Sequence, residues 1–335
     1  MGAVLSILLV TFPFFALVLC GYVAARRAWL PQAAIPGLNT FVLYFALPCM
    51  LYRFGSSTPI AQLLDGSLIV VYLLCALLMI AFTVAVTLGR GQRGSKRLRS
   101  GLGWNDAAFG ALVAAFPNTG FMGVPLLVAL LGQAAAGPTI VTITIDMLLT
   151  SSLCIALSRL DSSSEPGLGL SGSASAARSA LKGVMSNPLP WAIALGTLAS
   201  AAGFVLPAPV MGSVSLLADA ASPVALFTIG AVLACSQMNS GLRTPVGRYL
   251  PVVLIKLVLH PLLVGAVGLG AIALGLPLER FALTVVVLVA ALPSASNVAM
   301  LAERFGADNG RIARIILLST SLAFFSFPAA VALLA

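Results

Sequence analysis

The sequence predicts an all-α integral membrane protein of ten transmembrane helices, arranged as two inverted repeats of five helices with interrupted helices 4 and 9. Hydrophobic residues make up 60% of the 335 residues and charged residues only 8%. A soluble domain could not carry this balance without a very large exposed apolar surface. The net charge of +9 is spread between apolar runs instead of gathering on one face, so nucleic acid is not an expected partner.

Ten apolar runs are long enough to cross a hydrocarbon core about 30 Å thick. The first run is read as a span and not as a secretion signal, because its basic residues follow the apolar stretch instead of preceding it. The sixth run is the shortest. In chain order the expected spans are 4–24, 34–54, 68–88, 104–131, 138–157, 190–206, 214–234, 250–274, 278–302 and 314–335.

Basic residues alternate between successive loops. Since short basic loops stay in the cytoplasm, this alternation predicts that both termini lie outside. The exceptions are Arg53, Lys256 and Arg280. The odd-numbered loops hold 15 of the 18 basic residues: Arg26, Arg27, Arg90, Arg93, Lys96, Arg97, Arg99, Arg159, Arg178, Lys182, Arg243, Arg248, Arg304, Arg311 and Arg314.

A segment rich in Ser and Gly, residues 159–186, separates the fifth and sixth runs and is expected to be a flexible cytoplasmic linker. It divides the chain into a first repeat, 1–158, and a second repeat, 187–335. Because each half has five spans, the second half must enter the membrane in the opposite orientation. Inverted repeats of this kind are an architecture of transporters.

The fourth span of each half is interrupted by proline. "VAAFPNTG" breaks at Pro117 and "VAALPSASN" breaks at Pro293, and proline frees backbone groups that are costly in hydrocarbon. A packing kink would explain one such break, but the matched pair favours a binding site between two opposed helix starts. The predicted substrate-binding residues follow the two prolines: Asn118, Thr119, Gly120, Ser294, Ser296 and Asn297.

Several stretches resemble the auxin efflux carrier family of bacterial transporters, relatives of the plant auxin carriers and of malonate permeases. They are "NTFVLYFALPCMLYRF" (39–54), "FPNTGFMGVPLLVALLG" (116–132), "SPVALFTIGAVLA" (222–234) and "ALPSASNVAMLAERFGAD" (291–308). The resemblance implies a fold like that of bile-acid symporters, with crossed fourth and ninth helices, in the bacterial inner membrane. It also implies a scaffold of spans 1, 2, 6 and 7, often dimeric, and an elevator-like transport unit of spans 3–5 and 8–10. The second crossover, Pro-Ser-Ala-Ser-Asn, departs from the plant Asn-Pro, which puts auxin itself in doubt as substrate.

Two charged residues fall inside spans, where each costs at least a few kcal/mol. Asp146 and Lys256 are the candidates for ion coupling, since either could exchange a proton when the protein reorients. A purely structural pair that holds two helices together is an equally good explanation. His260 is expected to be a packing residue, and Asp106 and Asp219 are expected to stabilise helix starts.

The sequence therefore predicts a secondary transporter of small organic anions, such as auxin-like or malonate-like carboxylates, that uses H⁺ or Na⁺ and works as a homodimer in lipid. A sodium-coupled symporter of the bile-acid type is the first alternative and a membrane-embedded enzyme the second. No enzyme is expected, because the sequence lacks paired catalytic aspartates, a Ser–His pair and zinc or nucleotide motifs. No cofactor or metal is expected either.

Overall fold

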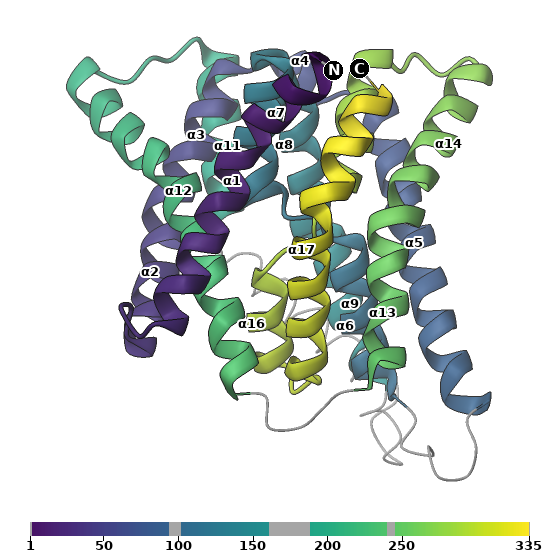
Figure 1. Cartoon of the computed structure of the whole chain (residues 1–335). Helices are drawn as coiled ribbons and strands as arrows, with labels where there is room; N and C mark the ends of the chain where they lie inside the picture. Colours follow the sequence, from purple (N-terminus) through teal and green to yellow (C-terminus); the bar gives the residue numbers. More distant parts are fainter. Residues whose placement is uncertain (1, 94–101, 161–187, 240–244, 335) are drawn as a thin grey trace, which may run out of the picture.

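The computed structural model describes residues 2–93, 102–160, 188–239 and 245–334, and within them it is a bundle of helices (Figure 1). Nearly all of the predicted linker, from residue 161 onward, lies outside these residues, as do Lys96, Arg97, Arg99, Arg178, Lys182 and Arg243. The first and last described helices bring both ends of the chain to the same end of the bundle, at the top of Figure 1.

Helices follow one another along the whole described chain. In the first half they are α1 (Gly2–Arg26), η1 (Gln32–Ala34), α2 (Ile35–Phe41), η2 (Val42–Ala46), α3 (Leu47–Ser57), α4 (Ile60–Leu63), α5 (Gly66–Arg93), α6 (Trp104–Ala115), η4 (Thr119–Gly123), α7 (Val124–Leu131), η5 (Gln133–Ala135), α8 (Ala136–Ile145), η6 (Asp146–Thr150) and α9 (Ser151–Leu157). In the second half they are α11 (Pro188–Ala202), α12 (Ala208–Asn239), α13 (Val246–Leu254), η8 (Ile255–Leu259), α14 (His260–Ala273), α15 (Arg280–Ala291), α16 (Asn297–Arg304) and α17 (Asn309–Leu334).

Within the described residues, seven helical stretches are long and apolar enough to cross a membrane: Leu9–Arg26, Gln32–Ser57, Ile60–Gly89, Gln133–Leu157, Ala208–Cys235, Val246–Ala273 and Asn309–Leu334. Three shorter apolar helices accompany them: Thr119–Leu131, Pro188–Ala202 and Arg280–Ala291. The chain is thus an all-helical, multi-pass membrane protein, as the sequence predicts.

Four π-helical turns widen the long helices, at η2, η4, η6 and η8. Three of them come directly before a helix with proline at its first or second position, which is Pro48, Pro125 or Pro261. A proline ring clashes with the carbonyl four residues earlier and offers that carbonyl no N–H, so the preceding turn opens. The fourth turn begins at Asp146 and has no such proline.

Two sets of helices pack extensively within themselves, and contacts such as those of α1 with α17 and α7 also join the two sets. α1 packs along α12, and α3 packs against both α11 and α12. The backbones of α1 and α12 meet at glycine, because a Cβ added to Gly21 would overlap the Phe227 carbonyl and one added to Gly230 would overlap the Val18 carbonyl. In the other group α5 packs on α6 and α14, and α15 packs on α8, α14 and α17.

A buried arginine joins three helices of the second group. Arg311, on α17, donates from Nε to the Arg248 carbonyl (2.9 Å) and from Nη1 to the Asp106 carbonyl (2.8 Å). The Asp106 carboxylate accepts from the Asp308 amide (2.8 Å) just before α17. Asp106 lies in the first turn of α6, where a negative charge favours the helix start as expected, and its carboxylate bonds to the Asp308 amide instead of to an amide of α6.

Asp219 differs from the expectation. It lies in the interior of α12, well beyond that helix's start at Ala208, because the helix begins earlier than the apolar run does. Its carboxylate forms an ion pair with Arg53 on α3 (2.7 Å). Asp219 therefore links two helices and does not stabilise a helix start.

Candidate functional site

The two proline breaks meet each other in the interior. The helix of α6 ends at Ala115 and helical structure resumes at Thr119, while α15 ends at Ala291 and α16 begins at Asn297. Between these ends Pro117 and Ser294 form an isolated antiparallel bridge. The Asn118 amide donates to the Pro293 carbonyl (2.8 Å), and the Ala295 amide donates to the Phe116 carbonyl (3.0 Å). Each break therefore satisfies backbone groups that the other leaves open.

This pairing brings the predicted substrate-binding residues together from two distant parts of the chain. Asn118 (4% exposed), Thr119 (0%) and Ser294 (1%) are buried, and Gly120, Ser296 and Asn297 are partly buried. A Cβ added at Gly120 would meet nothing within 4 Å. The site is thus enclosed, but it leaves open space beside Gly120.

Some polar atoms at the crossing have no partner. Ser294 Oγ and Asn297 Oδ1 are buried without a hydrogen bond in the described structure, whereas the Ser294 amide donates to Ser319 Oγ (3.2 Å). Unpaired buried polar atoms cost about 1–3 kcal/mol each. Their position beside two helix starts is where a polar solute could pair with them.

Ser222 was not predicted as a site residue. Its hydroxyl, on α12, donates to the Phe121 carbonyl in the π-turn after Asn118 (3.3 Å). The contact joins the helix group of α1 and α12 to the first crossover. Ser222 opens the stretch "SPVALFTIGAVLA" that resembles the auxin efflux carriers, but its partner lies 101 residues away and no local pattern predicts it.

The two intramembrane charges lie apart from each other, each with neutral partners. Asp146 accepts from Tyr72 Oη (2.9 Å) and Thr150 Oγ1 (3.1 Å), while Lys256 Nζ lies 3.0 Å from His260 Nδ1. Both side chains are fully buried. Asp146 and Lys256 form no ion pair with one another in the described structure. The direct structural pair that the sequence analysis considers is therefore absent.

Lys256 is tied to the second crossover. Its Nζ donates to the Ala290 carbonyl (2.9 Å) in the last turn of α15. In a continuous helix that carbonyl would accept from the Ser294 amide, which here bonds to Ser319. A cation at a helix end is also favoured by the helix dipole. The break at Pro293 thus creates the acceptor that holds Lys256, and His260 is part of this cluster and not only a packing residue.

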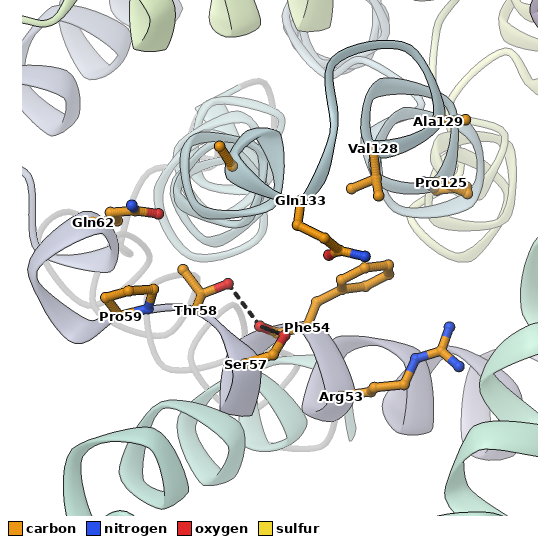
Figure 2. Close-up of a pocket in the computed structure, with 11 residues that line it drawn as sticks. Arg53, Phe54, Ser57, Thr58, Pro59, Gln62, Pro125, Val128, Ala129 and Gln133 are labelled. Atoms are coloured by element: carbon orange, nitrogen blue, oxygen red, sulfur yellow. Dashed lines mark hydrogen bonds between the residues drawn. The ribbon is translucent and has the colours of Figure 1, made fainter.

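Two cavities flank the crossing, and neither is lined by the six predicted binding residues. One, of about 650 Å³, lies between α3–α4 and α7–η5 and is lined by Arg53, Phe54, Gln62, Pro125, Val128 and Gln133, among others (Figure 2). The other, of about 840 Å³, is lined mainly by residues of α2, η2, α12, α16 and α17, including Asn39, Tyr44, Ala299, Glu303 and Asn309.

Comparison with known proteins gives one family and several relatives. Residues 6–331 match the model of a family described as membrane transport protein. A protein of Rhizobium meliloti (strain 1021) named "Putative malonate transporter" is 28% identical over 317 residues, which are 92% of this chain and 90% of that protein. "Uncharacterized transporter YfdV" of Escherichia coli (strain K12) is 27% identical and covers 88% of this chain and 86% of its own. An "Uncharacterized transporter" of Methanothermobacter thermautotrophicus is 27% identical and covers 93% of each.

Proposed function

The chain belongs to the membrane transport protein family, the auxin efflux carrier family that the sequence resembles, and on this basis we propose that it is a secondary transporter of small organic anions. That it is a multi-pass membrane transporter follows from the family and from the long apolar helices. The substrate class is inferred from two sources: paired helix starts favour anions, and one relative is named for malonate.

The proposed architecture has ten spans in two inverted repeats. The seven long apolar stretches supply seven spans, α11 supplies one, and the interrupted pairs α6–α7 and α15–α16 supply the fourth and ninth. The antiparallel contact between the two breaks supports this arrangement, because inverted halves bring equivalent breaks together from opposite sides. The basic loops favour an orientation with both termini on the outer face of the inner membrane.

The proposed mechanism is of the elevator type. The packing of α1, α3, α11 and α12 on one another supports a scaffold of spans 1, 2, 6 and 7, and the mutual packing of α5, α6, α8, α14, α15 and α17 supports a separate transport unit. Contacts between the groups, such as Ser222 with Phe121, would then break and reform during transport. A homodimer through the scaffold belongs to the same proposal.

The observation that carries the proposed site is the bridge between Pro117 and Ser294, beside which Ser294 Oγ and Asn297 Oδ1 are left without partners. Asn118 and Thr119 lie at the start of one helical segment, and Ser296 and Asn297 at the start of the other. A small carboxylate placed there would meet two positive helix ends and these neutral polar groups.

Proton coupling through Asp146 and Lys256 is the proposed energy source. Asp146 lies in a buried network with Tyr72 and Thr150, and Lys256 bonds to the Ala290 carbonyl three residues before Pro293. A change in the charge of Lys256 would therefore act on the end of α15 and on the crossover. Sodium coupling is the alternative, in which backbone carbonyls of the breaks would hold Na⁺.

The test is uptake of labelled malonate and related mono- and dicarboxylates by proteoliposomes, with imposed gradients of H⁺ or Na⁺. We expect saturable uptake that follows the pH gradient and does not require Na⁺. Asn118→Ala should abolish both uptake and ligand-induced thermal stabilisation. If Asn118→Ala binds and transports as the wild type does, the crossovers are not the substrate site.

A further inference from the structure

The cavity between α3–α4 and α7–η5 contains one charged side chain. Among the residues that line it, Arg53 is the only ionisable one, and its polar neighbours are Ser57, Thr58, Gln62 and Gln133. Figure 2 shows the Arg53 guanidinium, the Phe54 ring and the Gln133 amide along one side of this space. A volume of about 650 Å³ is ample for a small dicarboxylate.

The free side-chain groups in this cavity include hydrogen-bond donors. The hydroxyls of Ser57 and Thr58 both donate to the Phe54 carbonyl (3.1 and 2.7 Å) and are therefore committed. The side-chain amides of Gln62 and Gln133 have no hydrogen bond in the described structure and can donate. Together with the guanidinium they favour a ligand that accepts hydrogen bonds.

Arg53 is held in place by its neighbours but keeps some of its hydrogen-bond donors free. Nη1 donates to Asp219 (2.7 Å), and the guanidinium lies 5.5 Å from the centre of the Phe54 ring. Arginine has five N–H donors in a fixed plane, so most of them remain for another acceptor. The Asp219 side chain is 67% exposed, so the ion pair is not enclosed by protein.

The position of Arg53 within a predicted membrane span needs a physical explanation. Arg53 departs from the basic-loop pattern, and a charge near a membrane span is costly unless it is paired or hydrated. A guanidinium binds a carboxylate through two parallel hydrogen bonds. Arginine on the same side of a cavity as a free amide, here that of Gln133, is an arrangement suited to a carboxylate subsite (Figure 2).

The cavity lies beside the helix that follows the first crossover. Pro125 and Val128, which line it, lie on α7, which continues the π-turn that starts after Asn118. Asp219 lies one helical turn before Ser222, whose hydroxyl bonds to the Phe121 carbonyl of that turn. The Arg53–Asp219 pair is therefore close, along α12, to the contact between α12 and the first crossover.

We propose that Arg53 forms an anion-binding subsite that receives one carboxylate of the transported anion before the anion reaches the crossovers. The inference rests on the proposed function, since it requires an anionic substrate. It adds a second binding position that does not follow from the geometry of the crossover. Gln133, whose amide lies on the same side of the cavity, would complete the subsite by donating to the same carboxylate.

The experiment is calorimetric titration of purified full-length protein with malonate and with its uncharged analogue malonamide. Arg53→Gln should weaken malonate binding by about tenfold or more, as expected for a lost charged hydrogen bond, and should leave malonamide binding unchanged. Arg280→Gln is the matched control, because it removes another cation outside the basic loops and away from this cavity. It should bind malonate as the wild type does.

Arg53→Lys tests the subsite even if the Gln variant misfolds, because lysine keeps the positive charge that faces Asp219. It should weaken malonate binding several-fold, since an ammonium cannot form the two-pronged contact. Malonate affinities within about twofold of the wild type in both Arg53 variants overturn the inference, given that tenfold is the expected loss. If malonate itself does not bind, acetate, oxalate and succinate are the further probes, and saturable binding of none of them also overturns it.

Asn118→Ala separates the two proposals. Loss of binding in Asn118→Ala with normal binding in Arg53→Gln overturns the Arg53 subsite and leaves the crossover site standing. Loss in Arg53→Gln with normal binding in Asn118→Ala supports the subsite and overturns the crossover as the site of binding.

Discussion

Two glycines in one π-turn make a sharp test of the crossover site. A Cβ at Gly120 would meet nothing within 4 Å, whereas one at Gly123 would lie 2.8 Å from Leu292 Cδ1, across the crossing. Gly120→Ala should therefore keep the thermal stability of the wild type but lower substrate affinity, because the added methyl group fills space that the bound solute would occupy. The measurements are the melting temperature and the Kd for the transported carboxylate.

Gly123→Ala is the companion variant and should behave in the opposite way. Its methyl group must displace Leu292 or open the bridge between the two breaks, which we expect to destabilise the protein by about 1–3 kcal/mol. A Gly120→Ala protein with wild-type affinity would show that the solute does not use the space beside this residue.

Asp146→Asn tests the role of the buried carboxylate. Asparagine keeps an oxygen that can accept from Tyr72 or Thr150 but cannot release a proton in this pH range. Uptake by the variant should therefore lose the pH dependence of the wild type over about pH 5–8, a range chosen to bracket a proton carrier that works near neutrality. The measurement is the initial rate of uptake at fixed substrate concentration across that range.

Asp65→Asn is the matched control for this change. Asp65 accepts from the Leu68 amide at the start of α5, and asparagine caps a helix about as well as aspartate. Its uptake should keep the wild-type pH profile. A wild-type profile in Asp146→Asn as well would remove Asp146 from the coupling mechanism.

The sequence predicts the two helix breaks because the chemistry there is local. Pro117 and Pro293 mark the breaks, since proline lacks an N–H and clashes with the preceding turn, and the polar residues proposed for the site follow them directly. Ser222, Tyr72 and the link from Lys256 to the Ala290 carbonyl are not predictable in this way, since each depends on a partner from another helix. Asp219 was misread for the same reason.

At the scale of the helix, the glycine contact between α1 and α12 sets how closely two long helices approach. Because a Cβ at Gly230 would overlap the Val18 carbonyl and lie 2.7 Å from the Tyr22 amide, Gly230→Ala must push the helices apart. Backbone atoms cannot move aside as a side chain can, so we expect a loss of about 1–3 kcal/mol or more. Thermal unfolding of the purified protein in detergent measures it.

Gly265→Ala on α14 is the matched control, since its added Cβ would make only an ordinary contact with Val287 at 3.8 Å. Alanine also favours the helix by up to about 1 kcal/mol over glycine. This variant should be as stable as the wild type or more stable. Equal stability of Gly230→Ala and Gly265→Ala would contradict the close approach of α1 and α12.

The helices themselves are predictable from apolar run length, but their irregularities are only partly so. Prolines at 48, 125 and 261 explain three π-turns after the fact, yet Pro223 lies inside α12 without one. The difference depends on which neighbouring groups can satisfy the freed carbonyl. That information lies in tertiary contacts, and the sequence pattern does not contain it.

For the molecule as a whole, the similarity between "VAAFPNTG" and "VAALPSASN" predicts that two breaks occur, and the structure adds that they pair through their backbones. The cavities beside the crossing could not be predicted. They form where helices from separate groups diverge, and their linings come from residues that show no common pattern in the sequence.

The elevator proposal can be tested by locking the two helix groups together. Thr58, at the end of α3, is held to the scaffold side because its carbonyl accepts from Ser200 Oγ on α11 (2.8 Å). A Cβ at Gly137, on α8, would lie 3.2 Å from Thr58 Cγ2. Cysteines at positions 58 and 137 are therefore close enough to form a disulfide, in a background without the five native cysteines.

Oxidation of this double variant should stop uptake, and a reducing agent should restore it, because the transport unit can no longer move against the scaffold. The single variants Thr58→Cys and Gly137→Cys show whether either change harms uptake by itself, which matters for position 137 because Gln62 Oε1 lies 2.9 Å from the added Cβ. Substrate binding should survive in the oxidised protein if only the movement is blocked. Full uptake by quantitatively cross-linked protein would mean that transport proceeds with α3 and α8 fixed together at this point, which is incompatible with an elevator that moves the two groups past each other.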